Sequence, residues 1–137
     1  MTFTEWHDGL RTSPMLRMLD LRVEVAGGNG QTLELRCRPD SRCTNRWKGV
    51  HGGFLALLFD EAAQILLCQQ YGDGNAATLD GHVHFTRALR PHREIVCTVR
   101  LEQRAGNHAT VEGTLSNGKV LYATYTSEWY IRTRARR

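Results

Sequence analysis

The sequence predicts an α+β fold in which one antiparallel sheet of about six strands curls around a single long central helix. Two stretches of alternating apolar and polar residues come first, one long apolar stretch follows, and four more alternating stretches complete the chain. Alternation with a period of two is typical of half-buried strands, whereas a long stretch that is apolar on all sides of the helical wheel is typical of a buried helix. A single sheet must then cover this helix on several sides.

The N-terminal region predicts a short helix over residues 4–12, followed by a two-stranded hairpin whose turn is the sequence GGNG at residues 27–30. Apolar residues alternate with polar ones on both sides of this turn, as they do in half-buried strands. The residues expected on the inner face are Leu19, Leu21, Val23 and Val25 before the turn, and Leu33, Leu35 and Cys37 after it.

Residues 54–68 predict the central helix, and Gly72 and Gly74 follow it as termination signals. Two adjacent acids, Asp60 and Glu61, stand in the middle of this apolar helix, where an unpaired charge is costly. They point about 100° apart on the helical wheel, so both cannot face one site. An acid in such surroundings is a candidate functional residue.

Four further strands are expected after the helix. In each stretch apolar and polar residues alternate, so each strand is expected to offer one apolar face to the core. The last two strands are joined by the sequence SNGK, in which Asn117 and Gly118 are the strongest short hairpin signal. The predicted strands span residues 77–85, 94–104, 108–116 and 120–131.

The length of 137 residues fits one domain, residues 1–137, with one hydrophobic core. Hydrophobic residues make up 41% and charged residues 23%, which is typical of globular proteins and excludes collagen-like or disordered chains. The sequence opens without a basic segment and apolar stretch, and it has no run of about eighteen apolar residues, so we expect a cytoplasmic protein without a membrane partner. The four cysteines form no C-x-x-C pair, which favours reduced core thiols over a zinc site.

The formal net charge of +4 comes partly from the sequence RTRARR at residues 132–137. Because arginines attract phosphates, nucleic-acid binding through this segment is one hypothesis. The chain carries no RNA-binding motif or interleaved aromatic residues beside it, and a short terminal arginine run is usually a solvated tail. We therefore expect a mobile tail and no nucleic-acid partner.

A short motif leads into the central helix: Asn45, then His51, Gly52 and Gly53, and finally Asp60, seven residues further on. A bare H-G-G sequence is weak evidence, but its combination with the upstream asparagine, the helical acid and the strand sequence TLDGHVHF is fairly specific. This combination resembles the hotdog-fold acyl-CoA thioesterases of the phenylacetate-degradation-related (PaaI-like) group. The order of strands and helix agrees over most of the chain, so the resemblance implies a hotdog fold and an acyl-CoA substrate.

The resemblance also implies a role for each residue that matches the family's motif. Asp60 stands where the family has its catalytic carboxylate, which acts as a general base on water or as a nucleophile. Gly52 stands where a backbone N–H at the helix start polarises the thioester carbonyl, and Asn45 where a side-chain amide assists beside it. Thr78 matches a position at which relatives carry a hydroxyl that helps to place the water or the carboxylate. The reaction requires no cofactor or metal.

The elementary chemistry of thioester hydrolysis agrees with these roles. Negative charge develops on the carbonyl oxygen, and free N–H groups at the start of a helix stabilise it together with the helix dipole. Glycine lets the backbone come close to the substrate. A carboxylate in apolar surroundings loses hydration and becomes a better base.

Further residues around the motif are expected to contact the substrate. Gln64 lies one turn beyond Asp60 on the same face of the helix, where it lines the site or an interface. Relatives often read F-x-R-P-A after the strand, whereas FTRALRP here places the proline three residues later and alters the following turn. The predicted substrate-binding residues are His51, Gly53, Gln64, Arg87 and Arg90, with the two arginines expected to meet the nucleotide phosphates of CoA.

The spacing of the motif indicates that one subunit does not hold a whole site. Gly52 and Asp60 are eight residues apart, which is about 12 Å along a helix. Both must nevertheless approach one carbonyl carbon within roughly 3 to 3.5 Å. We therefore predict a two-fold dimer, with pairing of dimers into a tetramer left open, in which one chain supplies Asn45 and Gly52 and its partner supplies Asp60 and Thr78.

Several residues have a second interpretation. His51 could be the base, although its position before two glycines favours a role in holding the helix start. Asn45 could cap the backbone of its own loop, and Glu61 could be the working acid. His82 and His84 share one face of a strand, as metal ligands in a sheet can, but the sequence shows no third ligand.

Two other functions on the same fold remain as hypotheses. A non-hydrolytic acyl-CoA binding or sensing module would bind the same ligand without turnover, because the fold alone does not determine the function. A dehydratase or hydratase would need an acid and a base positioned to move protons on acyl carbons, and the residues here fit that reaction less well. Release of free CoA distinguishes the hydrolase from both.

Overall fold

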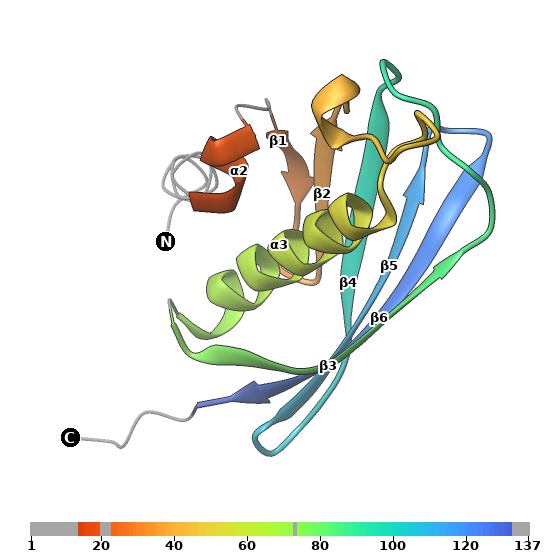
Figure 1. Ribbon diagram of the computed structural model, residues 1–137. Helices are drawn as coiled ribbons and strands as arrows, with labels where there is room; N and C mark the ends of the chain where they lie inside the picture. The colour runs from red at the N-terminus through yellow and green to blue at the C-terminus, as the bar shows by residue number, and fades with distance from the viewer. Residues whose placement is uncertain (1–13, 20–22, 73, 133–137) are drawn as a thin grey trace.

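A computed structural model describes residues 14–19, 23–72 and 74–132 of the chain. One antiparallel sheet of six strands curls around a single long helix, as Figure 1 shows. The predicted α+β architecture is therefore confirmed. The helix expected over residues 4–12 and the tail residues 133–137 lie outside the described ranges.

The elements follow the order expected from the sequence, with a short helix and a 3₁₀ turn in addition. The helices are α2 (Pro14–Leu19) and α3 (Gly52–Tyr71), and the 3₁₀ turn is η1 (Ser41–Cys43). The strands are β1 (Val23–Gly28), β2 (Thr32–Cys37), β3 (Ala76–Phe85), β4 (Ile95–Ala105), β5 (His108–Ser116) and β6 (Leu121–Ile131).

The strands lie in the order β1-β2-β4-β5-β6-β3, and every neighbouring pair is antiparallel. β3 follows α3 in the chain but does not lie beside β2. It occupies the far edge of the sheet, where Thr78 pairs with Trp129 and Phe85 with Ala123 of β6 (Figure 1). This crossover brings β3 alongside α3 and places its residues near the helix.

α3 is the core helix of the domain. It follows His51 and ends before Gly72, whose φ of 91° lies in the left-handed region that suits glycine. Judged by length and composition alone, α3 could also cross a membrane, but a buried core helix passes the same test. Its side chains that are buried in the core are Phe54, Leu55, Leu58, Phe59, Ala62, Ala63, Leu66 and Leu67.

The sheet supplies the other half of this hydrophobic core. The predicted alternation on β4 and β5 is confirmed, because the residues expected to face inward are buried, except the half-buried Leu101, while their neighbours are more exposed. The fully buried inward residues of these strands are Ile95, Cys97, Val99, Ala109, Val111 and Leu115.

All four cysteines are free thiols. Cys37 and Cys97, which the strand pattern places inside, are buried in the core. Burial raises the pKa of the Cys37 thiol to about 12 and also raises the pKa of Cys97. Both therefore stay protonated near neutral pH and pack as small apolar side chains.

The start of the first strand was predicted wrongly. β1 begins at Val23, whereas Leu19 belongs to the last turn of α2. α2 begins at Pro14, and proline suits the first position of a helix because no N–H is needed there. Leu19 therefore belongs to a helix rather than to the predicted strand, while residues 20–22 lie outside the described ranges.

The expectation that every strand buries an apolar face is wrong for β3. Almost all of its side chains are exposed, including Leu79 at 58% and Phe85 at 49%. β3 is an edge strand, and within the described part of the chain no further strand pairs with its outer edge. A long, unpaired and partly apolar edge is a template for pairing with another chain.

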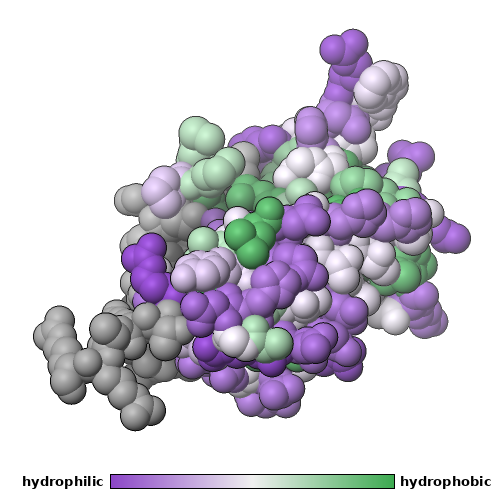
Figure 2. Space-filling model, turned by 90° about the horizontal axis from the view of Figure 1, so that it is seen from below, coloured by the Kyte–Doolittle hydropathy of each residue, from purple (hydrophilic) through white to green (hydrophobic). Residues whose placement is uncertain are grey.

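The described part of the face seen from below is mostly polar, as Figure 2 shows. Large apolar side chains that remain exposed are therefore notable, because clusters of them mark interaction sites. Among the described residues these are Met15, Met18, Trp47, Leu79, Phe85, Leu121 and Tyr130.

Candidate active site

The start of α3 is capped by the side chain of His51. Its Nδ1 accepts the N–H of Gly53 at 2.9 Å, and its carbonyl oxygen accepts the N–H groups of Phe54 and Leu55. Among the described residues, the Gly52 N–H is the one donor of this first turn without an acceptor. The helix dipole gives this N–H a partial positive charge, so it can polarise a carbonyl oxygen.

The glycine at position 52 has a steric reason that the sequence did not reveal. A Cβ added to Gly52 would lie 3.0 Å from Cζ of the Phe85 ring, closer than Cβ contacts in proteins normally are. Phe85, at the end of β3, therefore forms a wall beside the free N–H. Sequence reasoning missed this residue, because an aromatic residue at the end of a strand is an ordinary feature there.

Asn45 holds the loop that precedes the helix. Its Oδ1 accepts the N–H groups of Trp47 at 2.9 Å and Gly49 at 3.2 Å, and its backbone N–H donates to the Gly49 carbonyl at 2.8 Å. The Asn45 side-chain oxygen therefore caps the backbone of its own loop, which was the second interpretation of this residue. The amide Nδ2 has no partner among the described residues, so a donor is left for a ligand.

Asp60 lies half-buried in the middle of α3, between two hydrogen-bond donors. Gln64 Nε2 donates to its Oδ2 at 2.6 Å, and Thr78 Oγ1 donates to its Oδ1 at 3.3 Å. Gln64 comes from the next turn of the helix and Thr78 from β3, so two elements fix the direction of the carboxylate. The fold thus brings three predicted site residues together.

Tyr125, a buried phenol whose pKa is affected by the charge of Asp60, is neutral. The Tyr125 ring stacks on Phe59 with centroids 4.8 Å apart. Burial, with a smaller contribution from the negative charge of Asp60, raises the pKa of Tyr125 to about 12. Tyr125 therefore remains a neutral phenol near neutral pH, and the carboxylate is the anionic group available for base chemistry.

The structure divides the predicted residues into two groups rather than one site. Gly52, Gly53, His51 and Asn45 lie at the helix start, whereas Asp60 and its two donors lie about two turns further along. Eight residues of helix correspond to about 12 Å, too far for both groups to act on one carbonyl.

The predicted phosphate-binding arginines lie near the helix start. The backbone N–H groups of Thr86 and Arg87 donate to the Tyr122 carbonyl, and the Leu89 carbonyl accepts the N–H of Val50 at 2.8 Å. The segment with Arg87 and the exposed Arg90 is thereby fixed against the loop before α3.

The other candidate residues are not assembled into a site. His82 and His84 are exposed on β3 and pair in register with Thr126 and Thr124 of β6. Within the described part of the chain, no three potential metal ligands come together.

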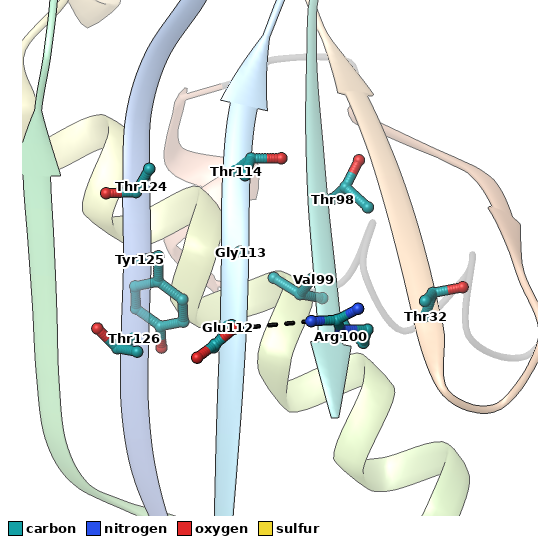
Figure 3. A pocket seen from close by; sticks show the side chains of 10 residues that line it. All are labelled: Thr32, Thr98, Val99, Arg100, Glu112, Gly113, Thr114, Thr124, Tyr125 and Thr126. Atoms are coloured by element: carbon teal, nitrogen blue, oxygen red, sulfur yellow. Dashed lines mark ion pairs between the residues drawn. The ribbon is translucent and has the colours of Figure 1, made fainter. Parts of the chain in front are cut away.

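A hollow of about 620 Å³ lies elsewhere, on the sheet, as Figure 3 shows. In the same view α3 lies behind the strands whose residues line the hollow. Its only acid, Glu112, pairs with Arg100 at 3.8 Å. The hollow contains none of the motif residues, so it is not the candidate active site. Its lining residues are Thr32, Thr98, Val99, Arg100, Glu112, Gly113, Thr114, Thr124, Tyr125 and Thr126.

A six-stranded antiparallel sheet wrapped around one long helix defines the hotdog class of α+β proteins. The chain belongs to the thioesterase superfamily, whose sequence profile matches residues 48–123, more than half of the 137 residues. This range contains the capped helix start, Asp60 and Thr78. No curated protein sequence gives a significant match.

Solved structures show the same fold. Thioesterase superfamily member 2 from Mus musculus superposes with a TM-score of 0.83, 18% identity and coverage of 95% of this chain and 98% of that one. A phenylacetic acid degradation-related protein from Ralstonia eutropha superposes with a TM-score of 0.77 and 24% identity, and the match covers 94% of this chain and 98% of that one. A hypothetical thioesterase from Streptococcus pneumoniae, solved with coenzyme A, superposes with a TM-score of 0.75 and 13% identity, and the match covers 82% of this chain and 92% of that one. At these identities the comparisons establish the hotdog fold, as the motif predicted.

Proposed function

We propose that this protein hydrolyses acyl-CoA thioesters to a free acid and CoA. The observation that carries the proposal is the pair of prepared groups on α3: an unpartnered N–H at Gly52 and a carboxylate at Asp60 oriented by two donors. Membership in the thioesterase superfamily supports the reaction class. The coenzyme A in the Streptococcus pneumoniae neighbour supports the choice of thiol carrier.

The reaction follows from the chemistry of these groups. The thioester carbonyl oxygen accepts the Gly52 N–H, with the Asn45 amide beside it, which stabilises the negative charge that develops there. Asp60 removes a proton from water, whose oxygen then attacks the carbonyl carbon, or its carboxylate attacks directly to form an anhydride that water hydrolyses. The C–S bond breaks, and CoA leaves as a thiolate that takes up a proton.

The complete site is formed by two subunits in this proposal. Two features support a second copy of the chain: the unpaired edge of β3, and the half-buried side of α3 that carries Asp60. A two-fold dimer that continues the sheet through β3 would cover Leu79 and bring one chain's Gly52 opposite its partner's Asp60.

A panel of acyl-CoA substrates with a thiol-reactive readout tests the reaction. We expect thiol release for at least one aromatic or aliphatic acyl group. Binding of the panel without thiol release would identify a binding or sensing module and refute the hydrolase. Because Cys37 and Cys97 are buried with raised pKa values, they contribute little background to such an assay.

Mixed dimers test the shared site. Asn45→Ala and Asp60→Asn are prepared separately, each nearly inactive, then unfolded together in equal amounts and refolded. A mixed dimer has one doubly damaged site and one intact site, so random pairing restores about a quarter of all sites under two-fold symmetry. Activity that stays at the average of the two variants would show that each chain builds its own site.

A further inference from the structure

Trp47 is the most exposed large apolar side chain among the described residues, at 80% exposure, and it stands on a fixed loop. The backbone N–H of Trp47 donates to Asn45 Oδ1, and the backbone N–H of Lys48 donates to the Asn45 carbonyl at 3.0 Å. Asn45 thus fixes Trp47 in the turn of residues 45–49, which precedes the helix start. A large aromatic side chain displayed on a rigid turn loses little conformational entropy when it binds a ligand.

The surroundings of Trp47 are positively charged. Arg46 lies over the tryptophan ring, with Cζ 5.6 Å from the ring centroid, and Lys48 follows in the chain. The segment with Arg87 and Arg90 is fixed beside this loop by the hydrogen bond from Val50 to the Leu89 carbonyl. Among the described residues none of these four cations forms an ion pair, so their charges are available to an anion.

Both segments consist of neutral and basic residues, and the nearby Asp40 forms an ion pair with Arg42. No acidic residue occurs over residues 41–59, and none occurs over residues 81–93. Two non-glycine residues of the described chain have positive φ, and one lies in each segment: Lys48 at 66° and His92 at 67°. Such strained backbone is retained where the surrounding structure requires it, and it is common at ligand sites.

We propose that Trp47 stacks on the adenine base of CoA while Arg46, Lys48 and Arg90 bind its phosphates. An exposed indole offers a face for a purine, and the surrounding cations complement the pyrophosphate and the ribose phosphate. This inference rests on the proposed function, because it assigns the nucleotide end of the same substrate. It assigns to residues 46–48 a role in substrate binding that is separate from the reacting groups.

Truncation of the substrate tests the inference. Trp47→Ala is compared with the unchanged protein on an acyl-CoA and on the matching acyl-pantetheine, which has the same thioester but no nucleotide. We expect KM for the acyl-CoA to rise about 10- to 100-fold, with kcat nearly unchanged. KM for the acyl-pantetheine should stay within about twofold, because the lost contact is absent from that substrate.

Two variants serve as controls. Trp47→Phe keeps an aromatic face and should recover most of the affinity for the acyl-CoA. Tyr130→Ala removes another exposed aromatic side chain, from β6, and should leave both KM values unchanged. Equal losses on both substrates, or a change in oligomeric state with Trp47→Ala, would show that Trp47 supports the fold or a subunit contact and would overturn the inference.

Calorimetry separates this inference from the proposed function. Coenzyme A itself is titrated into the unchanged protein and into Trp47→Ala. If the unchanged protein hydrolyses no substrate but binds CoA with an affinity that depends on Trp47, the hydrolase fails and the nucleotide site stands. Hydrolysis with the same CoA affinity in both proteins would remove the nucleotide site and leave the hydrolase intact.

Discussion

The start and the middle of α3 present different functional groups: an N–H without an acceptor at the start, and a carboxylate held by two donors in the middle. At the start, His51 occupies the donors around Gly52, so one backbone N–H remains for a ligand. In the middle, Gln64 and Thr78 donate to Asp60, so a charged side chain is oriented and partly shielded from water. The helix start therefore offers an N–H donor of fixed direction, and the middle of the helix offers an oriented carboxylate.

This difference shows why neither region is a site by itself. A lone N–H can polarise a carbonyl but cannot activate water, and a lone carboxylate can activate water but cannot stabilise an oxyanion. The same helix carries both groups, at a separation that prevents them from acting on one substrate within one chain. Two copies related by a two-fold axis would resolve the conflict without any new residue.

The largest expected effect comes from removing the proposed base, Asp60. Asp60→Asn keeps the size of the side chain and one acceptor oxygen, so the fold and acyl-CoA binding should remain. Turnover should fall about 10²- to 10⁴-fold, the usual scale for a positioned base. Steady-state kinetics and a thermal unfolding curve measure the two properties, and unchanged turnover would remove Asp60 from the mechanism.

A smaller loss is expected at the helix start. Gly52→Ala keeps the N–H but places a Cβ 3.0 Å from the Phe85 ring, so the ring or the helix start must shift. A displacement of a binding group by a fraction of an ångström to 1 Å should lower kcat/KM about 10- to 100-fold.

A second substitution shows whether this contact is the cause. Adding Phe85→Leu to Gly52→Ala shortens the opposing side chain and should recover part of the lost activity. If the double variant is no better than Gly52→Ala alone, then the backbone N–H rather than the ring contact is what the methyl group disturbs.

The cap of the helix start gives a still smaller effect. His51→Ala removes the acceptor for the Gly53 N–H and should lower the free energy of unfolding by about 1 kcal/mol. His51→Asn supplies an oxygen in the same role and should keep most of the stability and activity. Denaturation and kinetics on both variants decide the question, because loss of activity with normal stability in His51→Asn would make His51 a base.

Much of the fold could be predicted from the sequence because side-chain patterns record which face of an element is buried. Alternation identified the inward residues of β4 and β5, such as Cys97 and Val111, and an apolar helical wheel identified α3. The helix extends beyond the apolar residues 54–68 at both ends, because Gly52 and Gly53, which the motif placed at the helix start, form its first turn and residues 69–71 continue it to Tyr71.

Other features could not be predicted from such patterns. Alternation shows which way a residue faces but not which strand lies beside it, so the position of β3 next to β6 was not foreseen. The motif pointed to Asp60 and Gly52, yet the contact of Phe85 with Gly52 and the exposed Trp47 depend on how distant segments meet. Contacts of that kind arise from tertiary structure and leave no local signal.

The smallest expected effect distinguishes the two adjacent acids. Glu61 follows Asp60 but points about 100° away around the helix, so it cannot reach the position that Asp60 occupies. Glu61→Gln keeps the shape of the side chain and should leave kcat/KM within about twofold of the unchanged protein, since exchanges away from a site have small effects. Thiol release by Glu61→Gln and Asp60→Asn, measured side by side at matched concentrations, gives the comparison. If Glu61→Gln loses more activity than Asp60→Asn, then Glu61 is the working acid. The hydrogen bonds from Gln64 and Thr78 to Asp60 would then serve only to hold the helix against β3.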